Sequence, residues 1–487
     1  MTSETALKLA LALPLIATLL TGLFAARPNL REFFTLLIAG ALFLVVASLT
    51  PAVLAGARPA VTLLEVLPGL RIALEVEPLG MLFALIASGL WIVTTCYSIG
   101  YMRAHNEGHQ TRFYACFAIA IFAAVGAAMA QNMFSLFIFY EVLTLSTYPL
   151  VTHHGTESAC KGGRTYLGIL LFTSVAFLLL AVVWTWMIAG TLDFKPGGIL
   201  QGKASDGMLM VLLALYVFGT GKAAVMPFHR WLPAAMVAPT PVSALLHAVA
   251  VVKVGVFTVM KVAVYIFGID LLSSTGISLP LMYAAAATVL IASLVALTKD
   301  NLKARLAYST VSQLSYIVLG AMLANRWGVM GGSMHIAMHA FGKITLFFCA
   351  GAIYVAAHKT EISDMRGIGR TMPVTTFAFL LGSLSVIGLP PFGGAWSKWY
   401  LALGAAEAHH GVLVAVLMIS SLLNIAYLLP IPVRGFFSAP DSGPDDVGIK
   451  EAPLFCLVPL CLTAAGGVVL FFFADKIYEL LAPIAQI

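Results

Sequence analysis

Apolar segments about as long as a lipid bilayer is thick recur along nearly the whole chain. Hydrophobic residues make up 61% of its 487 positions, charged residues only 10%, and the mean hydropathy is +0.98. Soluble domains are about 45–50% apolar and about 25% charged, so a water-soluble fold of this size could not bury so much apolar surface. We therefore expect an all-α integral membrane protein. The composition excludes a disordered chain, a disulfide scaffold and a nucleic-acid-binding domain.

The number of transmembrane helices follows from the breaks between apolar segments, because each helix needs about 20 mostly apolar residues. Charge clusters and Pro, Gly or Asn runs divide the chain into about 14 helices. Their predicted ranges are 7–26, 33–54, 79–101, 113–130, 132–151, 165–189, 209–229, 236–266, 276–297, 304–323, 329–356, 371–403, 411–433 and 453–473. The longest connections, 55–78 and 434–452, are too short for a soluble domain. We therefore expect one transmembrane domain, residues 1–487, with a retained first helix rather than a cleaved signal peptide.

Basic residues indicate how the helices are oriented. An even number of crossings places both termini on one side. Connections after odd-numbered helices hold 15 Lys and Arg residues, whereas the other connections and the termini hold 7. Because cytoplasmic loops are enriched in Lys and Arg, we expect a multi-pass protein of the inner (plasma) membrane with both termini on the non-cytoplasmic side.

A few charged residues remain inside the predicted helices once those at helix ends and in connections are set aside. They are Glu141 and five lysines, namely Lys222, Lys253, Lys261, Lys343 and Lys398. An intramembrane charge costs about 2.5–3.5 kcal/mol on insertion scales, so such residues are functional candidates. Burial can bring lysine close to neutrality, whereas arginine stays charged, and this favours groups that gain and lose protons. Lys261 is near a predicted helix end, where we expect its side chain to snorkel to the membrane surface.

Histidines accompany two of these lysines. His247 precedes Lys253 by six residues, so the two need not share a helix face. His335, His339 and Lys343 are spaced i, i+4 and i+8, which places them on one stripe of a helix. A third metal ligand is not close in sequence and the cysteines lack metal-site spacing, so we predict a proton relay rather than a metal site. The histidines of the connections, such as His153 and His154, are expected to be solvated.

Two predicted helices are strongly broken, and each contains one lysine. Lys222 lies in the segment GTGKAAVMPFHRWLPAAMVAPTPVSALLHAVAVVKVG, and Lys398 lies in GLPPFGGAWSKWYL. Broken helices at membrane depth are typical of ion sites in transporters. The two breaks are five helices apart, which predicts two five-helix repeats, 113–266 and 276–433. An odd number of crossings per repeat makes these repeats inverted.

At these segments the chain resembles the antiporter-like membrane subunits shared by Mrp multisubunit Na⁺/H⁺ antiporters, respiratory complex I and membrane-bound hydrogenases. The resemblance covers nearly the whole chain and is most specific in FYEVLTLSTYPLV, HIAMHAFGKITLFF and the two broken segments. It implies fourteen helices, with inverted repeats of helices 4–8 and 9–13. Chain length and the loop KTEISDMRGIGRTMP are most similar to the D-type Mrp subunit.

The resemblance also implies roles for individual residues. By position, Glu141 is the helix-5 glutamate and Lys222 its helix-7 partner; some family members carry Glu where this chain has Lys398. The implied relay residues are Glu141, Lys222, His247, Lys253, His335, His339, Lys343 and Lys398. Opening and closing of a Glu141–Lys222 ion pair would change the proton affinity of the next group. The implied partners are other membrane subunits, and no cofactor is expected in this chain.

Two other functions remain open from the sequence. The chain could be a proton-pumping subunit of a redox complex, in which case redox catalysis would lie in partner subunits, because the sequence has no flavin, haem or Fe–S motif. A non-transporting scaffold would not account for the buried lysines. Since Glu141 is the sole acid in the predicted helices, we expect this chain to carry protons and any Na⁺ to pass through partners.

Overall fold

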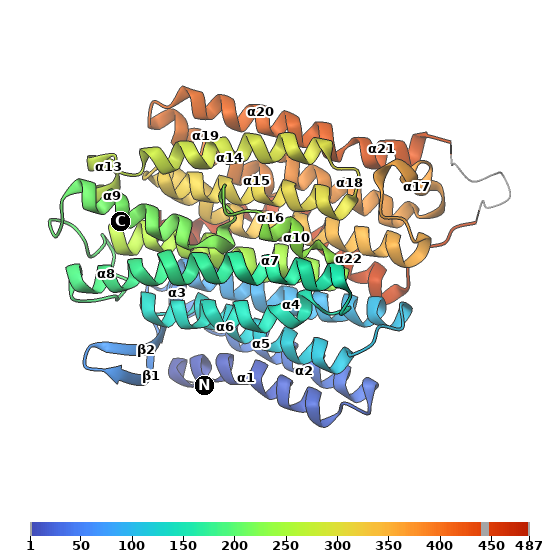
Figure 1. Ribbon diagram of the computed structural model, residues 1–487, viewed down its shortest axis with the longest axis horizontal. Coiled ribbons are helices and arrows are strands. Elements are labelled where there is room, and N and C mark those ends of the chain that lie inside the picture. The colour runs from blue at the N-terminus through green and yellow to red at the C-terminus, as the bar shows by residue number, and fades with distance from the viewer. Residues whose placement is uncertain (1, 440–447, 486–487) are drawn as a thin grey trace.

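The computed structural model describes residues 2–439 and 448–485 and consists of helices that run side by side along its long axis (Figure 1). The N-terminal elements are α1 (Ser3–Leu23), α2 (Pro28–Ala47), α3 (Thr50–Leu54), β1 (Ala60–Leu67), β2 (Leu70–Glu75), α4 (Pro78–Ala104), α5 (Gln110–Ala128) and α6 (Met133–Val151). Next come α7 (Glu157–Thr173), the π-helix η1 (Ser174–Leu178), α8 (Leu179–Ala189) and α9 (Asp206–Gly219).

The middle of the chain contains the most fragmented helices. They are η2 (Gly221–Ala223), α10 (Trp231–Ala234), η3 (Ala235–Val237), α11 (Thr240–Ala244), η4 (Leu245–Val249), α12 (Val251–Lys261), η5 (Val262–Phe267) and α13 (Ile269–Thr275). Of these, η2 and η3 are 3₁₀-helices, whereas η4 and η5 are π-helices. Because π-helical turns are rare and occur frequently at functional sites, the segment from α11 to η5 is a candidate site region.

Longer helices dominate the C-terminal half. They are α14 (Leu279–Thr298), α15 (Leu302–Met322), α16 (Arg326–Ala357), the 3₁₀-helix η6 (Ile362–Met365), α17 (Ile368–Thr371), α18 (Pro373–Ile387), α19 (Gly394–Glu407), α20 (Gly411–Leu428), α21 (Pro430–Phe437), α22 (Leu454–Phe472) and α23 (Ala474–Ala485). At 32 residues α16 is the longest described helix that is α-helical throughout, and it packs against α15, α18, α19 and α22.

Eleven helices in the described part of the chain are long and apolar enough to cross a membrane. The remaining three predicted spans fall on α9, on the pair α18 and α19, and on α15. The first two are interrupted, and α15 is rich in Ser, Thr, Gln and Tyr. The mostly helical membrane fold is thereby confirmed, whereas the count of fourteen and the two repeats, 113–266 and 276–433, stay predictions.

One element was not expected. The connection 55–78 contains a hairpin in which β1 pairs antiparallel with β2, with Ala60 opposite Glu75 and Leu67 opposite Leu70. Gly69 at its turn has a φ of +80°, a conformation open to glycine. In Figure 1 the hairpin, the start of α1 and the C label all lie at the left end of the helices.

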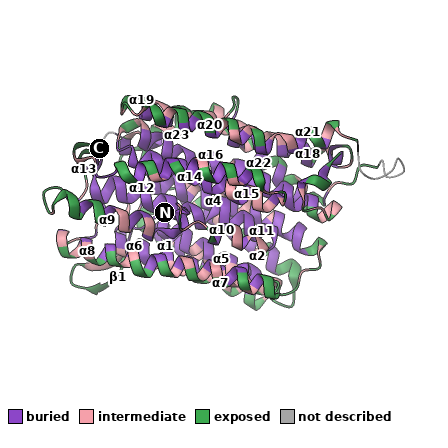
Figure 2. Ribbon diagram, turned by 45° about the horizontal axis from the view of Figure 1, so that its top comes forward, coloured by how far each residue is buried: buried purple, intermediate pink, exposed green. Residues whose placement is uncertain are grey.

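Burial divides the helices into an enclosed interior and an apolar periphery. Figure 2 shows buried residues throughout the centre and exposed residues along the outer faces of the peripheral helices. Large hydrophobic side chains are exposed on these outer faces, including Leu23, Leu44, Phe172, Met187 and Phe437. Exposed apolar surface on this scale fits contact with lipid, which needs no polar partner.

Candidate functional site

Lys222 lies in the gap between α9 and α10, where the helix is interrupted by η2. Its ammonium group donates to the Tyr140 carbonyl at 2.8 Å and to the Thr144 hydroxyl, and it lies 3.1 Å from the centre of the Tyr140 ring. The backbone groups freed by the break are also satisfied, since Trp231 Nε1 donates to the Gly221 carbonyl at 2.9 Å. These contacts make a non-helical segment tolerable at membrane depth.

Small residues hold this break in place. A Cβ on Gly219 would lie 2.4 Å from the Leu178 nitrogen, and one on Gly255 would lie 2.4 Å from the Lys222 carbonyl carbon. Helix α12 and the π-turn η1 therefore approach the broken segment closely from two directions. The position of Lys222 is set by backbone packing as well as by its own hydrogen bonds.

Glu141 does not form the expected ion pair in this structure. The Lys222 ammonium bonds to the preceding residue, Tyr140, and to Thr144, while Glu141 itself is only partly buried. Its Oε1 atom has no hydrogen-bond partner among the described residues. The Lys222 ammonium is satisfied instead by the Tyr140 carbonyl and the Thr144 hydroxyl of the same helix, so the ion pair is open in this structure.

His247 occupies the π-turn η4 and is completely buried. Its ring lies 4.5 Å from the Phe347 ring of α16, and both ring nitrogens lack a partner among the described residues. The π-turn is followed by Ala250, whose backbone is not helical. The angle that an ideal helix would set between His247 and Lys253 therefore does not apply here, and the two residues contact different neighbours.

A lysine–histidine contact joins α12 to α16. Lys253 Nζ lies 2.6 Å from His339 Nδ1, and both side chains are almost completely buried. The rings of His339 and His335 follow each other along α16, with centroids 5.7 Å apart. The predicted stripe of His335, His339 and Lys343 thus faces the protein interior.

The contacts continue from His335 to Lys398. His335 Nδ1 lies 2.8 Å from Ser397 Oγ, and Nε2 lies 3.1 Å from Gln313 Oε1. The His335 ring stacks on Tyr316 at 5.6 Å, and Lys398 Nζ lies 5.0 Å from the centre of the Tyr316 ring. Lys398 also donates to the Ile387 carbonyl at 2.9 Å, across the break between α18 and α19. A row of side chains, each in contact with the next, therefore crosses the interior. We call it the lysine–histidine file; its members are Lys253, His339, His335, Tyr316 and Lys398.

Lys343 is buried beside this file but has other partners. Its ammonium donates to Ser309 Oγ at 2.6 Å, and Ser309 also accepts from Tyr427 Oη at 2.9 Å. Among the described residues, no acidic side chain lies in an ion pair with Lys222, Lys253, Lys343 or Lys398. Buried ammonium groups are costly without a counter-ion, so hydroxyls, carbonyls and imidazole serve as acceptors here.

Helix α15 supplies several polar partners that the sequence had not singled out. Ser309, Gln313 and Tyr316 are fully buried and contact Lys343, His335 and Lys398 respectively. Their spacing of four and three residues places them on one face of the helix. A stripe of polar residues in a predicted transmembrane helix could have identified these partners from the sequence.

Lys261 corrects a prediction, because it does not snorkel. It is 1% exposed, lies 3.3 Å from Glu77 Oε1 and donates to the Ala130 carbonyl at 3.1 Å. Glu77 also accepts from Tyr265 Oη at 2.9 Å and caps the start of α4. Because these acceptors lie inside the protein, the Lys261 side chain does not extend to the membrane surface.

We expect Glu77→Gln to destabilise the protein, because it leaves the Lys261 ammonium buried without its counter-ion. Breaking a buried ion pair from one side costs about 3–5 kcal/mol, whereas replacing both partners is often nearly neutral. The apparent melting temperature of the purified protein in detergent should fall by several degrees and should largely recover in Glu77→Gln/Lys261→Met. The exposed Glu65 of β1 offers a matched control, Glu65→Gln. Equal melting temperatures for Glu77→Gln and Glu65→Gln would contradict the ion pair.

The loop histidines also differ from expectation. His153 is 4% exposed, with Nε2 3.8 Å from Glu107, while the more exposed His154 lies 3.2 Å from the same carboxylate. The hydrogen bond to Glu107 raises the pKa of His154, and the same bond lowers the pKa of Glu107. These residues tie the loop after α4 to the loop after α6, so the prediction that both histidines are solvated is wrong for His153.

Comparison with known proteins places this arrangement in a family. The family described as "NADH:quinone oxidoreductase/Mrp antiporter, TM" matches residues 130–424, which include all eight predicted relay residues. Subunit N of the NADH-quinone oxidoreductase of Desulforudis audaxviator is 32% identical over 424 residues, covering 84% of each chain. The D-type subunit of the Na(+)/H(+) antiporter of Alkalihalophilus pseudofirmus is 26% identical over 418 residues, covering 85% of this chain and 83% of the relative.

Other relatives are longer, and solved structures share the fold. Chain 5 of the NAD(P)H-quinone oxidoreductase of Synechocystis sp. is 31% identical over 345 residues, and this chain covers 49% of it. A chain in the structure of the Mrp complex from Dietzia sp. superimposes with a TM-score of 0.88 at 22% identity, covering 100% of this chain and 97% of that chain. The family model spans more than half of the chain, and the first relative is similar over most of its length. This protein is therefore a multi-pass membrane protein of the NADH:quinone oxidoreductase/Mrp antiporter family.

Proposed function

We propose that this chain is the proton-translocating subunit of a multisubunit Na⁺/H⁺ antiporter of the Mrp type. The observation that carries the proposal is the set of buried lysines held by hydroxyl, carbonyl and imidazole groups. An ammonium group with such partners can lose its proton without leaving a buried carboxylate uncompensated, so these contacts suit proton exchange. A structural ion pair would instead resemble Lys261 with Glu77.

In this proposal, movement of charge between Glu141 and Lys222 would drive proton transfer at the neighbouring groups. Two unit charges about 4 Å apart interact by about 4 kcal/mol at an effective dielectric constant of about 20. Closure of a Glu141–Lys222 ion pair from the open arrangement described above would therefore change the proton affinity of neighbouring groups. His247 and Lys343 would respond first, and the lysine–histidine file would carry the change to Lys398. At the break between α18 and α19, Lys398 would exchange protons with the opposite side.

The proposal includes the membrane, the orientation and the partners of the subunit. It would lie in the inner (plasma) membrane with both termini on the non-cytoplasmic side, as the distribution of basic loops indicates. Other membrane subunits of a hetero-oligomeric complex would be its partners, as the names of the similar proteins suggest. Because Glu141 is the sole acid of the proposed relay, Na⁺ would pass through those partners and not through this chain.

A second function is favoured by one observation. The 32% identity to a subunit of NADH-quinone oxidoreductase exceeds the 26% identity to the D-type antiporter subunit. In that case the same residues would translocate protons in a complex driven by electron transfer. No redox cofactor is expected in this chain under either proposal.

The two functions are separated by what drives proton movement. In everted vesicles from cells that express the complete complex, a pre-formed proton gradient should collapse when Na⁺ is added, with no added electron donor. Acridine-dye fluorescence reports the gradient. A complex that responds to Na⁺ only while an electron donor is being oxidised would contradict the antiporter and support the redox-driven pump. Vesicles without the complex are the control.

A further inference from the structure

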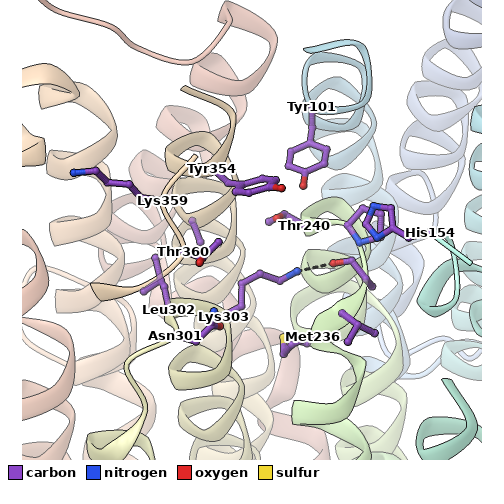
Figure 3. A pocket seen from close by; sticks show the side chains of 14 residues that line it. Tyr101, His154, Met236, Thr240, Asn301, Leu302, Lys303, Tyr354, Lys359 and Thr360 are labelled. Atoms are coloured by element: carbon purple, nitrogen blue, oxygen red, sulfur yellow. Dashed lines mark hydrogen bonds between the residues drawn. The ribbon is translucent and has the colours of Figure 1, made fainter. Parts of the chain in front are cut away.

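A lysine-lined pocket of about 210 Å³ opens at the end of the helices where α4, α11, α15 and α16 meet (Figure 3). Its inner wall is buried and includes Tyr101, Thr240 and Ala350. Its outer rim includes Tyr354 and Thr360, which are exposed. The pocket thus leads from the protein surface into the helix bundle, and none of its lining residues belongs to the predicted relay.

Lys303 dominates this pocket. Figure 3 shows its side chain stretched across the pocket from α15 toward the start of α11, where the ammonium donates to the Ala238 carbonyl at 2.5 Å. The other charged or titratable residues of the lining include Lys359 and His154, and the lining contains no aspartate or glutamate. The lining thus presents the Lys303 ammonium and no carboxylate.

Two acids that contact lining residues are already engaged. Glu107 lies 3.2 Å from His154 Nε2, and Glu361 accepts a hydrogen bond from Asn301 Nδ2 at 2.9 Å. A sodium ion that entered the pocket would lose water and meet the Lys303 ammonium without a carboxylate in the lining to compensate. A proton can instead pass along hydroxyl and imidazole groups, which donate and accept in turn.

Two helices lead from the pocket to His247. Thr240 lies at the start of α11, and His247 follows seven residues later, a rise of about 10 Å along the helix. On α16, Ala350 lines the pocket, and Phe347 one turn away contacts the His247 ring at 4.5 Å. Both ring nitrogens of His247 lack a partner among the described residues, so the ring is a candidate proton acceptor below the pocket.

We infer that the lysine-lined pocket is a proton-selective entrance to the relay and that Lys303 is the residue that keeps Na⁺ out of it. The inference rests on the proposed function, which it deepens by naming the ion that this chain admits. It also gives a physical reason why Na⁺ would use partner subunits. Lys303 acts here through its charge on the pocket and not by joining the relay.

Charged thiol reagents test the inference without requiring transport. In a chain whose native cysteines are replaced, Ala350→Cys places a thiol in the pocket wall. The assembled complex in everted vesicles is then treated with a cationic trimethylammonium-ethyl or an anionic sulfonatoethyl methanethiosulfonate. After normalisation to a free thiol, the anionic reagent should react faster. Lys303→Met should shift the ratio of the two rates toward the cationic reagent by roughly tenfold, because one nearby charge is lost.

Two matched variants separate charge from structure. Lys303→Arg keeps the charge and should preserve the ratio, and Lys299→Met removes a charge close in sequence but outside the pocket lining and should do the same. An unchanged ratio in Lys303→Met, or no reaction with either reagent from either face, would overturn the inference. Neither result bears on the proposed function, because labelling of the cysteine requires no ion transport. Loss of exchange in the relay variants is measured separately.

Discussion

Replacing Lys222 by alanine should lower Na⁺-driven proton exchange in everted vesicles to about one-tenth of wild type or less, while the complex still assembles. The ammonium group bonds to the Tyr140 carbonyl and the Thr144 hydroxyl inside a broken helix, and alanine cannot carry a proton there. A loss of about 1.4 kcal/mol of charge coupling already changes an equilibrium tenfold. Glu141→Ala should have the same effect, since it removes the one acid of the proposed relay that can attract the Lys222 charge.

The same assay needs two comparison variants, one that removes a lysine elsewhere and one that removes a partner of Lys222. Lys195, in the connection between α8 and α9, is an exposed lysine that gives the control Lys195→Ala, which should retain exchange. Thr144→Val removes one acceptor of the Lys222 ammonium at nearly constant volume and should lower exchange less than Lys222→Ala. Assembly is checked by co-purification of the other subunits. Near-normal exchange in Lys222→Ala or Glu141→Ala would rule out the relay assignment.

Breaking the Lys253–His339 contact should have a comparably large effect. The 2.6 Å contact joins α12 to α16 at the start of the lysine–histidine file. His339→Leu removes the acceptor and leaves the Lys253 ammonium buried and unsatisfied, which costs more than replacing both partners. We expect His339→Leu to abolish exchange and to lower the melting temperature of the complex. Lys253→Met/His339→Leu should regain the stability but not the exchange.

Measuring stability and exchange separately distinguishes a proton-carrying contact from a purely structural one. A purely structural contact would recover both stability and exchange in the double variant. His339→Gln keeps an acceptor for Lys253 but cannot carry a proton, so it should retain more stability than exchange. His409 lies outside the file and has a φ of +57°, which asparagine tolerates, so His409→Asn is a suitable control for loss of a histidine.

Much of the site was predictable because lysine is so costly inside a membrane. Lys222, Lys253 and Lys343 stand out in an apolar sequence, and the structure places all three in the interior with no exposed surface. The i, i+4 and i+8 spacing also predicted that His335, His339 and Lys343 share one face, because residues four apart lie on the same side of a regular helix. Glycines and prolines around Lys222 and Lys398 correctly indicated the helix breaks.

The sequence could not show which neighbour each side chain contacts. The π-turn η4 changes the rotation of α12 relative to His247, and sequence periodicity does not reveal such a turn. The burial of Lys261 likewise depends on Glu77 and the Ala130 carbonyl, which lie far from it in the sequence, so the prediction of a snorkelling lysine was wrong. Gln313 and Tyr316 were overlooked because neutral polar residues cost less in a membrane than charges do, although they complete the contacts between His335 and Lys398.

The central claim is that protons cross the membrane through the buried lysines of this chain. Its most direct test is Na⁺-driven proton flux in proteoliposomes that contain the purified complex, with wild type and Lys222→Ala measured side by side. We expect a Na⁺-dependent internal pH change in wild type and none above the liposome background in Lys222→Ala at equal protein content. An equal proton flux in the two preparations would show that protons take another route.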